Sequence, residues 1–303
     1  MLQILETTDL TQIFAPYRGQ LGKYNQWIVP QIDPDQYAGE TDVIPATRLL
    51  EPEFLVDLLS RWDTKLGTNN LKVEASLWIK YYCNVIFPPV LGAMSLGGLG
   101  LDASLANTSL VLSRTAGLKK LEGPGYPIRA IFGDSPRTVI YGPRCAVPGQ
   151  AERAIRPVNS VAELHQVVFK QLFEGHFAPL FEQFQSVTAV SKKVLWGSLG
   201  AAIFGFYQQL GDRVGSQAAS LEDAPALLDS PENTDIAPGK NPLYHPVQLR
   251  FLNDAALPDP VRVRNSCCLW YKVPGAQRCT TCPLLKPEER AELLKVKAAK
   301  KAG

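Results

Sequence analysis

Residues 265–283 read NSCCLWYKVPGAQRCTTCP and hold four of the chain's six cysteines in the spacing C-C-x10-C-x2-C. A C-x2-C pair on a tight turn lets two sulfurs converge on one metal, a geometry shared by zinc knuckles and iron–sulfur loops. Pro274 and Gly275 supply a turn between the two halves. Successive side chains of a strand point to opposite faces, so the adjacent Cys267 and Cys268 predict a loop at this place.

Three interpretations of this cysteine pattern compete. A disulfide framework is disfavoured, because the chain is long, has few cysteines and begins without a secretory signal. A structural zinc site with four thiolate ligands and an iron–sulfur cluster both fit the spacing. The residues alone leave these two metal interpretations open.

The same motif resembles that of the FhuF-like ferric-siderophore reductases, in which it holds a [2Fe–2S] cluster. Cys267, Cys268, Cys279 and Cys282 fall on all four motif positions, and residues 274–275 and 283–284 are also of the family's type. Residues 74–82 and 194–197 resemble helices of the family, which extends the similarity over about residues 70–285. The resemblance implies that these four cysteines are the metal-binding, cofactor-binding and catalytic residues.

A second, looser resemblance lies in residues 102–107, DASLAN. They are similar to a stretch of the IucA/IucC-type siderophore synthetases, whose C-terminal part shares a fold with these reductases. Ser104 and Ala106 stand where the synthetase pattern has His and Gln. The loss of those polar groups argues against ATP-dependent synthesis and agrees with a reductase.

Composition sets the broad class of the protein. The 303 residues are 46% hydrophobic and 20% charged, with a net charge of +2, so the chain can bury a sizeable core without a metal to hold it together. The modest charge and the lack of a basic run interleaved with aromatics weigh against nucleic-acid binding. Without a signal or a long apolar run, we expect a cytoplasmic protein with at most peripheral membrane contact through its lysine-rich end.

Hydrophobic periodicity predicts an α+β fold, a predominantly helical body with a small antiparallel sheet, and the family resemblance implies a C-terminal iron–sulfur loop. Helices are expected at 51–66, at 72–87 with an end before Pro88 and Pro89, at 160–186, at 190–211, around 246–253 and from 286 onward. Short β-type runs with tight connections lie at 108–112, 118–121, 128–132 and 138–141.

These patterns divide the chain into five parts. We expect an N-terminal segment (1–70) packed on a FhuF-like α+β body (71–213), then a surface loop or linker (214–245), the [2Fe–2S] segment (246–285) and a basic tail helix (286–303). The three histidines lack metal-ligand spacing and are expected to be structural, while Cys83 and Cys145 are expected to be core thiols.

The family resemblance implies one-electron reduction of siderophore-bound Fe(III), with a hydroxamate favoured as the siderophore. No flavin or nicotinamide site is visible, so a separate donor protein or a small reductant must supply the electron. The alternatives are an iron–sulfur carrier or sensor and a zinc-stabilised siderophore-binding module. Basic residues in or beside the loop, namely Arg262, Arg264, Lys272 and Arg278, are expected to offset the negative charge of the cluster. The candidate substrate residues are Lys80, Arg129, Trp196, Arg264, Lys272 and Arg278.

Overall fold

Helix α3 (Leu71–Gly97) runs through the centre of the molecule, and α2 (Pro52–Leu66) and α6 (Lys192–Asp212) pack against it. The computed structural model describes residues 14–17, 19–21, 41–113, 128–132, 139–141 and 156–302. The Asn70 side chain caps the start of α3 by accepting from the Val73 N–H at 3.2 Å. The helix ends at Gly98, whose φ of 65° is the left-handed conformation that glycine adopts without strain.

The expected end of this helix before Pro88 is wrong. Helix α3 continues through both prolines to Gly97. A proline inside a helix removes one backbone hydrogen bond and costs about 3 kcal/mol. The segment from Val85 to Met94 is fully buried, so the burial of its apolar side chains offsets that penalty.

The helix expected at 160–186 is confirmed as a continuous run of three parts. These are α4 (Val161–Phe169), the π-helical segment η7 (Lys170–Phe177) and α5 (Ala178–Thr188). Its buried aromatic stripe packs toward α3, where Trp78 stacks on Phe184 with ring centroids 5.4 Å apart. Helices α2 and α6 confirm the predictions at 51–66 and 190–211.

Short strands form two three-stranded sheets, and the α+β class is confirmed. One sheet has the antiparallel order β1 (Thr41–Pro45), β3 (Thr108–Ser113) and β4 (Ile128–Phe132). The other has the order β2 (Leu99–Leu101), β5 (Val139–Tyr141) and β6 (Arg156–Pro157), with β5 and β6 parallel. The run at 118–121 and Cys145 lie outside the described residues.

The C-terminal third differs most from expectation. The expected linker at 214–245 contains π-helical η8 (Ala218–Asp223) and α7 (Ala224–Leu228), with Leu227, Ile236 and Leu243 buried. The helix expected around 246–253 is wrong, because β7 (Val247–Arg250) pairs there with β8 (Val261–Arg264) as an antiparallel hairpin. Helix α8 (Pro287–Ala302) confirms the predicted tail helix.

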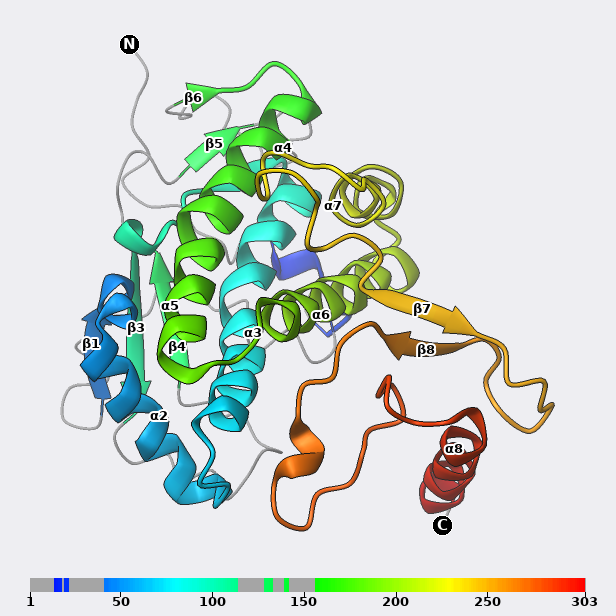
Figure 1. Cartoon of the computed structure of the whole chain (residues 1–303). Coiled ribbons are helices and arrows are strands. Elements are labelled where there is room, and N and C mark those ends of the chain that lie inside the picture. The colour runs from blue at the N-terminus through cyan, green and yellow to red at the C-terminus, as the bar shows by residue number, and fades with distance from the viewer. Residues whose placement is uncertain are drawn as a thin grey trace.

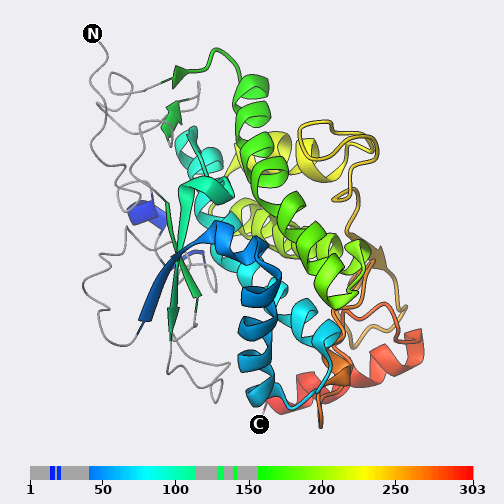
Figure 2. The same ribbon diagram turned by 60° about the vertical axis from the view of Figure 1, so that its left-hand side comes forward.

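Figures 1 and 2 show the β1-β3-β4 sheet on one side of the helical layer and the β7–β8 hairpin with α8 on the other. The remaining short elements are the 3-10 helices η1 (Ala15–Tyr17), η4 (Ala46–Leu50), η5 (Leu105–Asn107) and η9 (Trp270–Lys272). Within the described part of the chain, no helix is both long and apolar enough to span a bilayer.

Candidate metal centre

We call residues 264–285 the cysteine segment, and two hydrogen bonds hold its first half in place. Strand β8 ends at Arg264, so Cys267 and Cys268 lie in a loop as predicted, and Leu269 has a φ of 60°. The Arg264 N–H donates to the Thr281 carbonyl at 3.0 Å, which joins the two halves of the segment. The Ser76 hydroxyl of α3 donates to the Cys268 carbonyl at 3.0 Å and fixes the adjacent cysteines to the helical body.

Two tight turns bring the second cysteine pair back toward the first. The Ala276 N–H donates to the Val273 carbonyl at 3.0 Å, and Gly275, with a φ of 74°, occupies the position that needs a positive φ in a type II turn. In the C-x2-C turn, the Cys282 N–H donates to the Cys279 carbonyl at 2.8 Å. The turn predicted at residues 274–275 is therefore confirmed.

Arg290 of α8 holds the C-x2-C turn from outside. Its guanidinium donates to the carbonyls of Thr280, of Cys282 at 2.9 Å and of Leu285 at 3.3 Å. Only 3% of Arg290 is exposed, so these bonds satisfy a buried cation with backbone carbonyls. The tail helix is thus part of the framework of the metal centre.

The four sulfurs lie as two pairs. The Sγ atoms of Cys267 and Cys282 are 3.8 Å apart. The Sγ atoms of Cys268 and Cys279 flank Arg264, whose Nη2 lies 3.4 Å from the first and 2.8 Å from the second. Two thiolates on one tetrahedral metal, with metal–sulfur bonds of about 2.3 Å, lie about 3.8 Å apart.

The two metal interpretations require different arrangements of the sulfurs. A single zinc ion with four thiolates needs all four sulfurs around one point. Among the residues that the structure describes, no three His, Cys, Asp or Glu side chains converge in that way. A centre with two metal ions needs two thiolates at each ion, and the 3.8 Å between the Cys267 and Cys282 sulfurs suits one such pair.

The two pairs also differ in electrostatic surroundings. Burial raises the pKa of the Cys267 thiol to about 11. Burial opposes ionisation of Cys268 as well, but the positive charges of Arg264 and Lys80 outweigh it and lower the pKa of this thiol. A positive charge therefore lies beside the Cys268 and Cys279 pair.

Comparison with known proteins identifies the family. Residues 76–259 match the family described as ferric iron reductase FhuF-like transporter, and residues 264–284 match the FhuF 2Fe-2S C-terminal domain. The chain belongs to the FhuF-like ferric iron reductase family. A comparison with curated proteins found no match.

Two solved structures are similar to the FhuF-like protein over about two thirds of its length. ATP-bound aerobactin synthetase IucA from a hypervirulent pathotype of Klebsiella pneumoniae is 15% identical, with a TM-score of 0.50, over 67% of this chain and 37% of that one. Aerobactin synthetase IucC from the same pathotype is 18% identical, with a TM-score of 0.48, over 70% of this chain and 37% of that one. The FhuF-like protein therefore spans little more than a third of either synthetase.

The cofactor of this FhuF-like protein is a [2Fe–2S] cluster, and the cysteine segment fits it. Such a cluster has two irons, each with two protein thiolates. The cysteine segment offers four thiols for this donor set, of which the Cys267 and Cys282 sulfurs lie 3.8 Å apart and the Cys268 and Cys279 sulfurs both contact Arg264.

A cavity of about 610 Å³ adjoins the cysteine segment on the side of the helical body. Asn265 and Ser266, directly before Cys267, form part of its wall, and Trp196 of α6 forms another part. Trp196 packs edge-on against Phe181 with ring centroids 5.0 Å apart. Ser266 is 7% exposed, and its hydroxyl has no hydrogen-bond partner in the described protein.

The structure brings some predicted substrate residues to the cysteines and leaves others apart. Arg264 contacts two sulfurs, and Lys80 is close enough to influence Cys268. Lys272 and Arg278 are exposed, and the Arg278 guanidinium lies over the Tyr271 ring, 5.5 Å from its centroid. Arg129 lies in β4, across the helical layer from the β7–β8 hairpin (Figures 1 and 2), and its side chain is outside the described part.

Sequence reasoning missed the residues that position the cysteines. Ser76 sits in a helix 192 positions before its partner, and Arg290 was counted only as a residue of a solvated tail helix. Neither has a local motif that reveals its contact. The one available signal was Gly197, because a glycine in mid-helix often marks a close approach, and here its partner is Ser266.

Proposed function

We propose that this protein reduces Fe(III) held in a siderophore of the hydroxamate type, seated in the cavity beside the cysteine segment. The observation that carries the proposal is the shared wall. Asn265 and Ser266 line the cavity and directly precede Cys267, so a bound ligand lies next to the metal centre. The cavity volume of about 610 Å³ is within the range of small-molecule sites.

The charge of the cavity suits a neutral ligand. Its lining includes the acids Glu174 and Glu182 and the bases Lys192, Lys193 and Lys240, and Lys192 pairs with Glu182 at 3.2 Å. Fe(III) with three monoanionic hydroxamates carries no net charge. Trp196 then offers an apolar contact to hold such a complex.

For this reaction the protein needs to hold the ferric complex in position and does not need to coordinate its iron. Hard oxygen donors hold Fe(III) far more tightly than Fe(II), so one added electron weakens the complex enough for iron to leave. The [2Fe–2S] cluster, when bound, supplies electrons one at a time. We assign its ligands as Cys267, Cys268, Cys279 and Cys282, with Arg264 and Lys80 as the cations that offset its charge.

The remaining assignments belong to the same proposal. A separate donor protein or a small reductant delivers the electron to the centre. Trp196 is a wall of the substrate site, while the exposed Lys272 and Arg278 are outside the cavity lining and stay predicted substrate contacts. The cytoplasmic location and the role of Arg129 stay predictions.

The test is an anaerobic visible spectrum before and after dithionite, followed by a ferric trihydroxamate with a ferrous chelator present. We expect charge-transfer bands that bleach on reduction and return when the siderophore is added, with Fe(II) trapped by the chelator. Trp196→Ala should slow the return of the bands more than Trp62→Ala, a change remote from the cavity lining. A centre that is reduced but ignores the ferric complex would instead indicate a carrier or sensor.

A further inference from the structure

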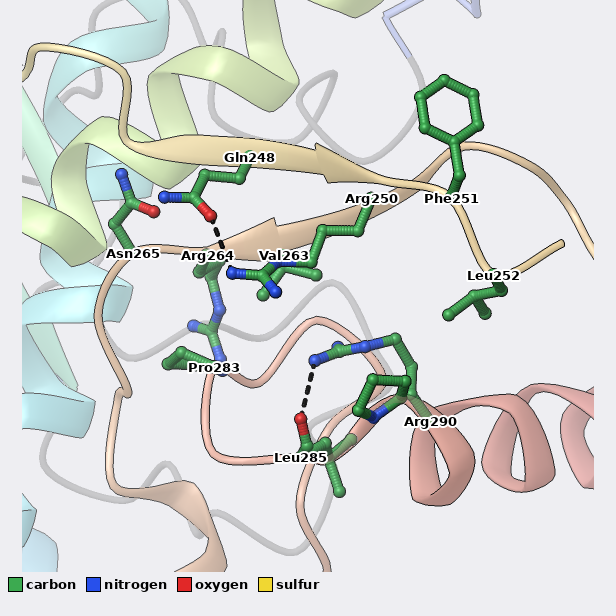
Figure 3. Close-up of a pocket in the computed structure, with 11 residues that line it drawn as sticks. Gln248, Arg250, Phe251, Leu252, Val263, Arg264, Asn265, Pro283, Leu285 and Arg290 are labelled. Atoms are coloured by element: carbon green, nitrogen blue, oxygen red, sulfur yellow. Dashed lines mark hydrogen bonds between the residues drawn. The ribbon is translucent and has the colours of Figure 1, made fainter.

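A second, smaller pocket opens on the outer side of the cysteine segment. It has a volume of about 320 Å³ and lies between the β7–β8 hairpin, the C-x2-C turn and the start of α8. Figure 3 shows Arg250 of β7, Arg264 of β8 and Arg290 of α8 extending into the same space. We call this hollow, lined by these three arginines and by Phe251, the arginine pocket.

The arginine pocket is strongly positive. Its lining residues, all within the described part of the chain, include three arginines and neither aspartate nor glutamate. Nearby acids are engaged elsewhere: Asp254 pairs with Lys295 at 2.8 Å, and Asp259 accepts from the Leu252 and Asn253 N–H groups. Their positive charge attracts an anionic ligand, and the exposed Arg250 is the guanidinium open to it, because Arg264 contacts thiol sulfurs and Arg290 is buried.

This pocket is connected directly to the metal centre. Arg264 lines it and also contacts the sulfurs of Cys268 and Cys279, at 3.4 and 2.8 Å. Arg290 lines it and bonds to the carbonyl of Cys282 at 2.9 Å. A partner bound here is separated from two of the four thiolates by a single side chain.

The pocket has features of a protein docking surface. Phe251 lines it while 69% exposed, and Arg250 is exposed, with one hydrogen bond to Gln248 at 3.1 Å. Exposed aromatic and arginine side chains are enriched at the centres of protein interfaces. The volume is at the lower limit for a small-molecule site, whereas the cavity beside Trp196, which is lined by both acids and bases, is about twice as large.

We infer that the arginine pocket is the docking site of an acidic electron-donor protein, whose surface carboxylates pair with the exposed Arg250. The inference rests on the proposed function in one respect, that the donor is a separate molecule. Donor and ferric complex then occupy two different pockets, which share Asn265 in their lining. In each encounter the reduced donor would pass one electron to the metal centre, and no atom or proton is transferred.

Binding tests this inference without turnover. The oxidised form of an acidic plant-type [2Fe–2S] ferredoxin serves as the probe, titrated calorimetrically into the holoprotein at low and at moderate salt. We expect a Kd that rises with salt, and Arg250→Glu should weaken binding at low salt by about tenfold or more. Arg250→Gln, which removes the charge without reversing it, should have a smaller effect.

The matched control is Arg213→Glu, the same change of charge at an exposed residue beyond the C-terminal end of α6. It should leave the Kd within about twofold, since isolated surface charges contribute little.

Equal weakening by Arg213→Glu and Arg250→Glu, or binding that ignores both, would overturn the inference. So would Arg250-dependent binding of an anionic Ga(III) chelate that displaces the ferredoxin, because the pocket would then be the substrate site. Reduction of ferric hydroxamate with dithionite needs no donor protein, so its failure would count against the proposed function alone.

Discussion

Arg264 brings a positive charge into direct contact with the cysteine sulfurs. Its Nη2 lies 2.8 Å from the Cys279 sulfur, whereas the exposed Arg278 guanidinium lies over Tyr271. A nearby cation favours the more negative, reduced state of an iron–sulfur centre. We therefore expect Arg264→Gln to lower the reduction potential by on the order of 100 mV. Arg278→Gln should shift it far less, because solvent screens an exposed charge.

A potentiometric titration monitored by visible absorption compares the two variants. Each must first show the wild-type ratio of iron to protein, since Arg264 also contributes to the geometry of the segment. Equal shifts in both variants would show that the contact of Arg264 with the sulfurs has no special effect.

The cysteines themselves allow a sharper comparison. Cys279→Ser replaces one of the two cysteines whose sulfurs contact Arg264, and we expect the visible bands to be lost or strongly weakened because one iron loses a thiolate ligand. Cys83→Ala changes a buried core thiol of α3 and should leave the spectrum intact. Retention of the full spectrum by Cys279→Ser would show that the ligand set is misassigned.

Gly197 shows how helix α6 and the cysteine segment depend on each other. A Cβ at this position would lie 2.2 Å from the Ser266 hydroxyl oxygen, closer than any real contact. We expect Gly197→Ala to push the segment away and to destabilise the centre by roughly 1–3 kcal/mol. The measurement is the temperature at which the visible bands are lost under anaerobic conditions.

Two variants control this prediction. Gly211→Ala lies on the same helix, where the nearest contact, Ser220 Cβ, is 3.3 Å away, and it should leave the bands unaffected. The double change Gly197→Ala with Ser266→Gly removes the obstructing side chain and should restore most of the lost stability. Without that rescue, the effect of Gly197→Ala would have another origin.

His176 links the π-helical segment η7 to α3. It is fully buried, its Nε2 lies 2.7 Å from the Tyr82 hydroxyl, and burial lowers its pKa to about 4. The unfolded chain, with a histidine pKa of about 6.5, binds this proton more readily, so stability is full above pH 6.5 and declines as the pH falls toward 4. The decline amounts to about 3 kcal/mol.

Denaturant unfolding between pH 7 and pH 4.5 measures this decline. His176→Gln should be less stable at neutral pH but should show a shallower dependence on pH. His245→Asn changes a half-exposed histidine and should keep the wild-type slope. A slope unchanged in His176→Gln would assign the acid sensitivity to other groups.

At the scale of the elements, the sequence predicted what local periodicity determines. The helices at 51–66 and 190–211 and the tail helix follow from apolar spacing and helix-end residues, and all three are confirmed. The extension of α3 through Pro88 and the β7–β8 hairpin depend on burial and on pairing with distant chain, which no local pattern contains. The same reason explains why the cysteines could be assigned from the motif while Ser76 and Arg290 could not.

Across the whole molecule, the helical body and the cysteine segment are structurally separable. The main hydrophobic core draws on residues from Phe14 to Leu243 and, among the described residues, includes none of the cysteine segment. The segment is held instead by hydrogen bonds, such as those of Ser76 and Arg290, and by the contact at Gly197. Because apolar burial is the main driving force of folding, the body should be stable without the metal centre.

Removal of the cluster under anaerobic conditions tests this separation. We expect the far-UV circular dichroism of the cluster-free protein to keep most of its helical signal and its cooperative thermal transition. Hydrogen exchange should increase in residues 264–285 and in α8, whose Arg290 loses an ordered turn to bind. In α3, exchange should stay slow, since its buried residues pack against α2 and α6. Collapse of the helical signal together with the visible bands would show instead that the [2Fe–2S] cluster organises the entire fold.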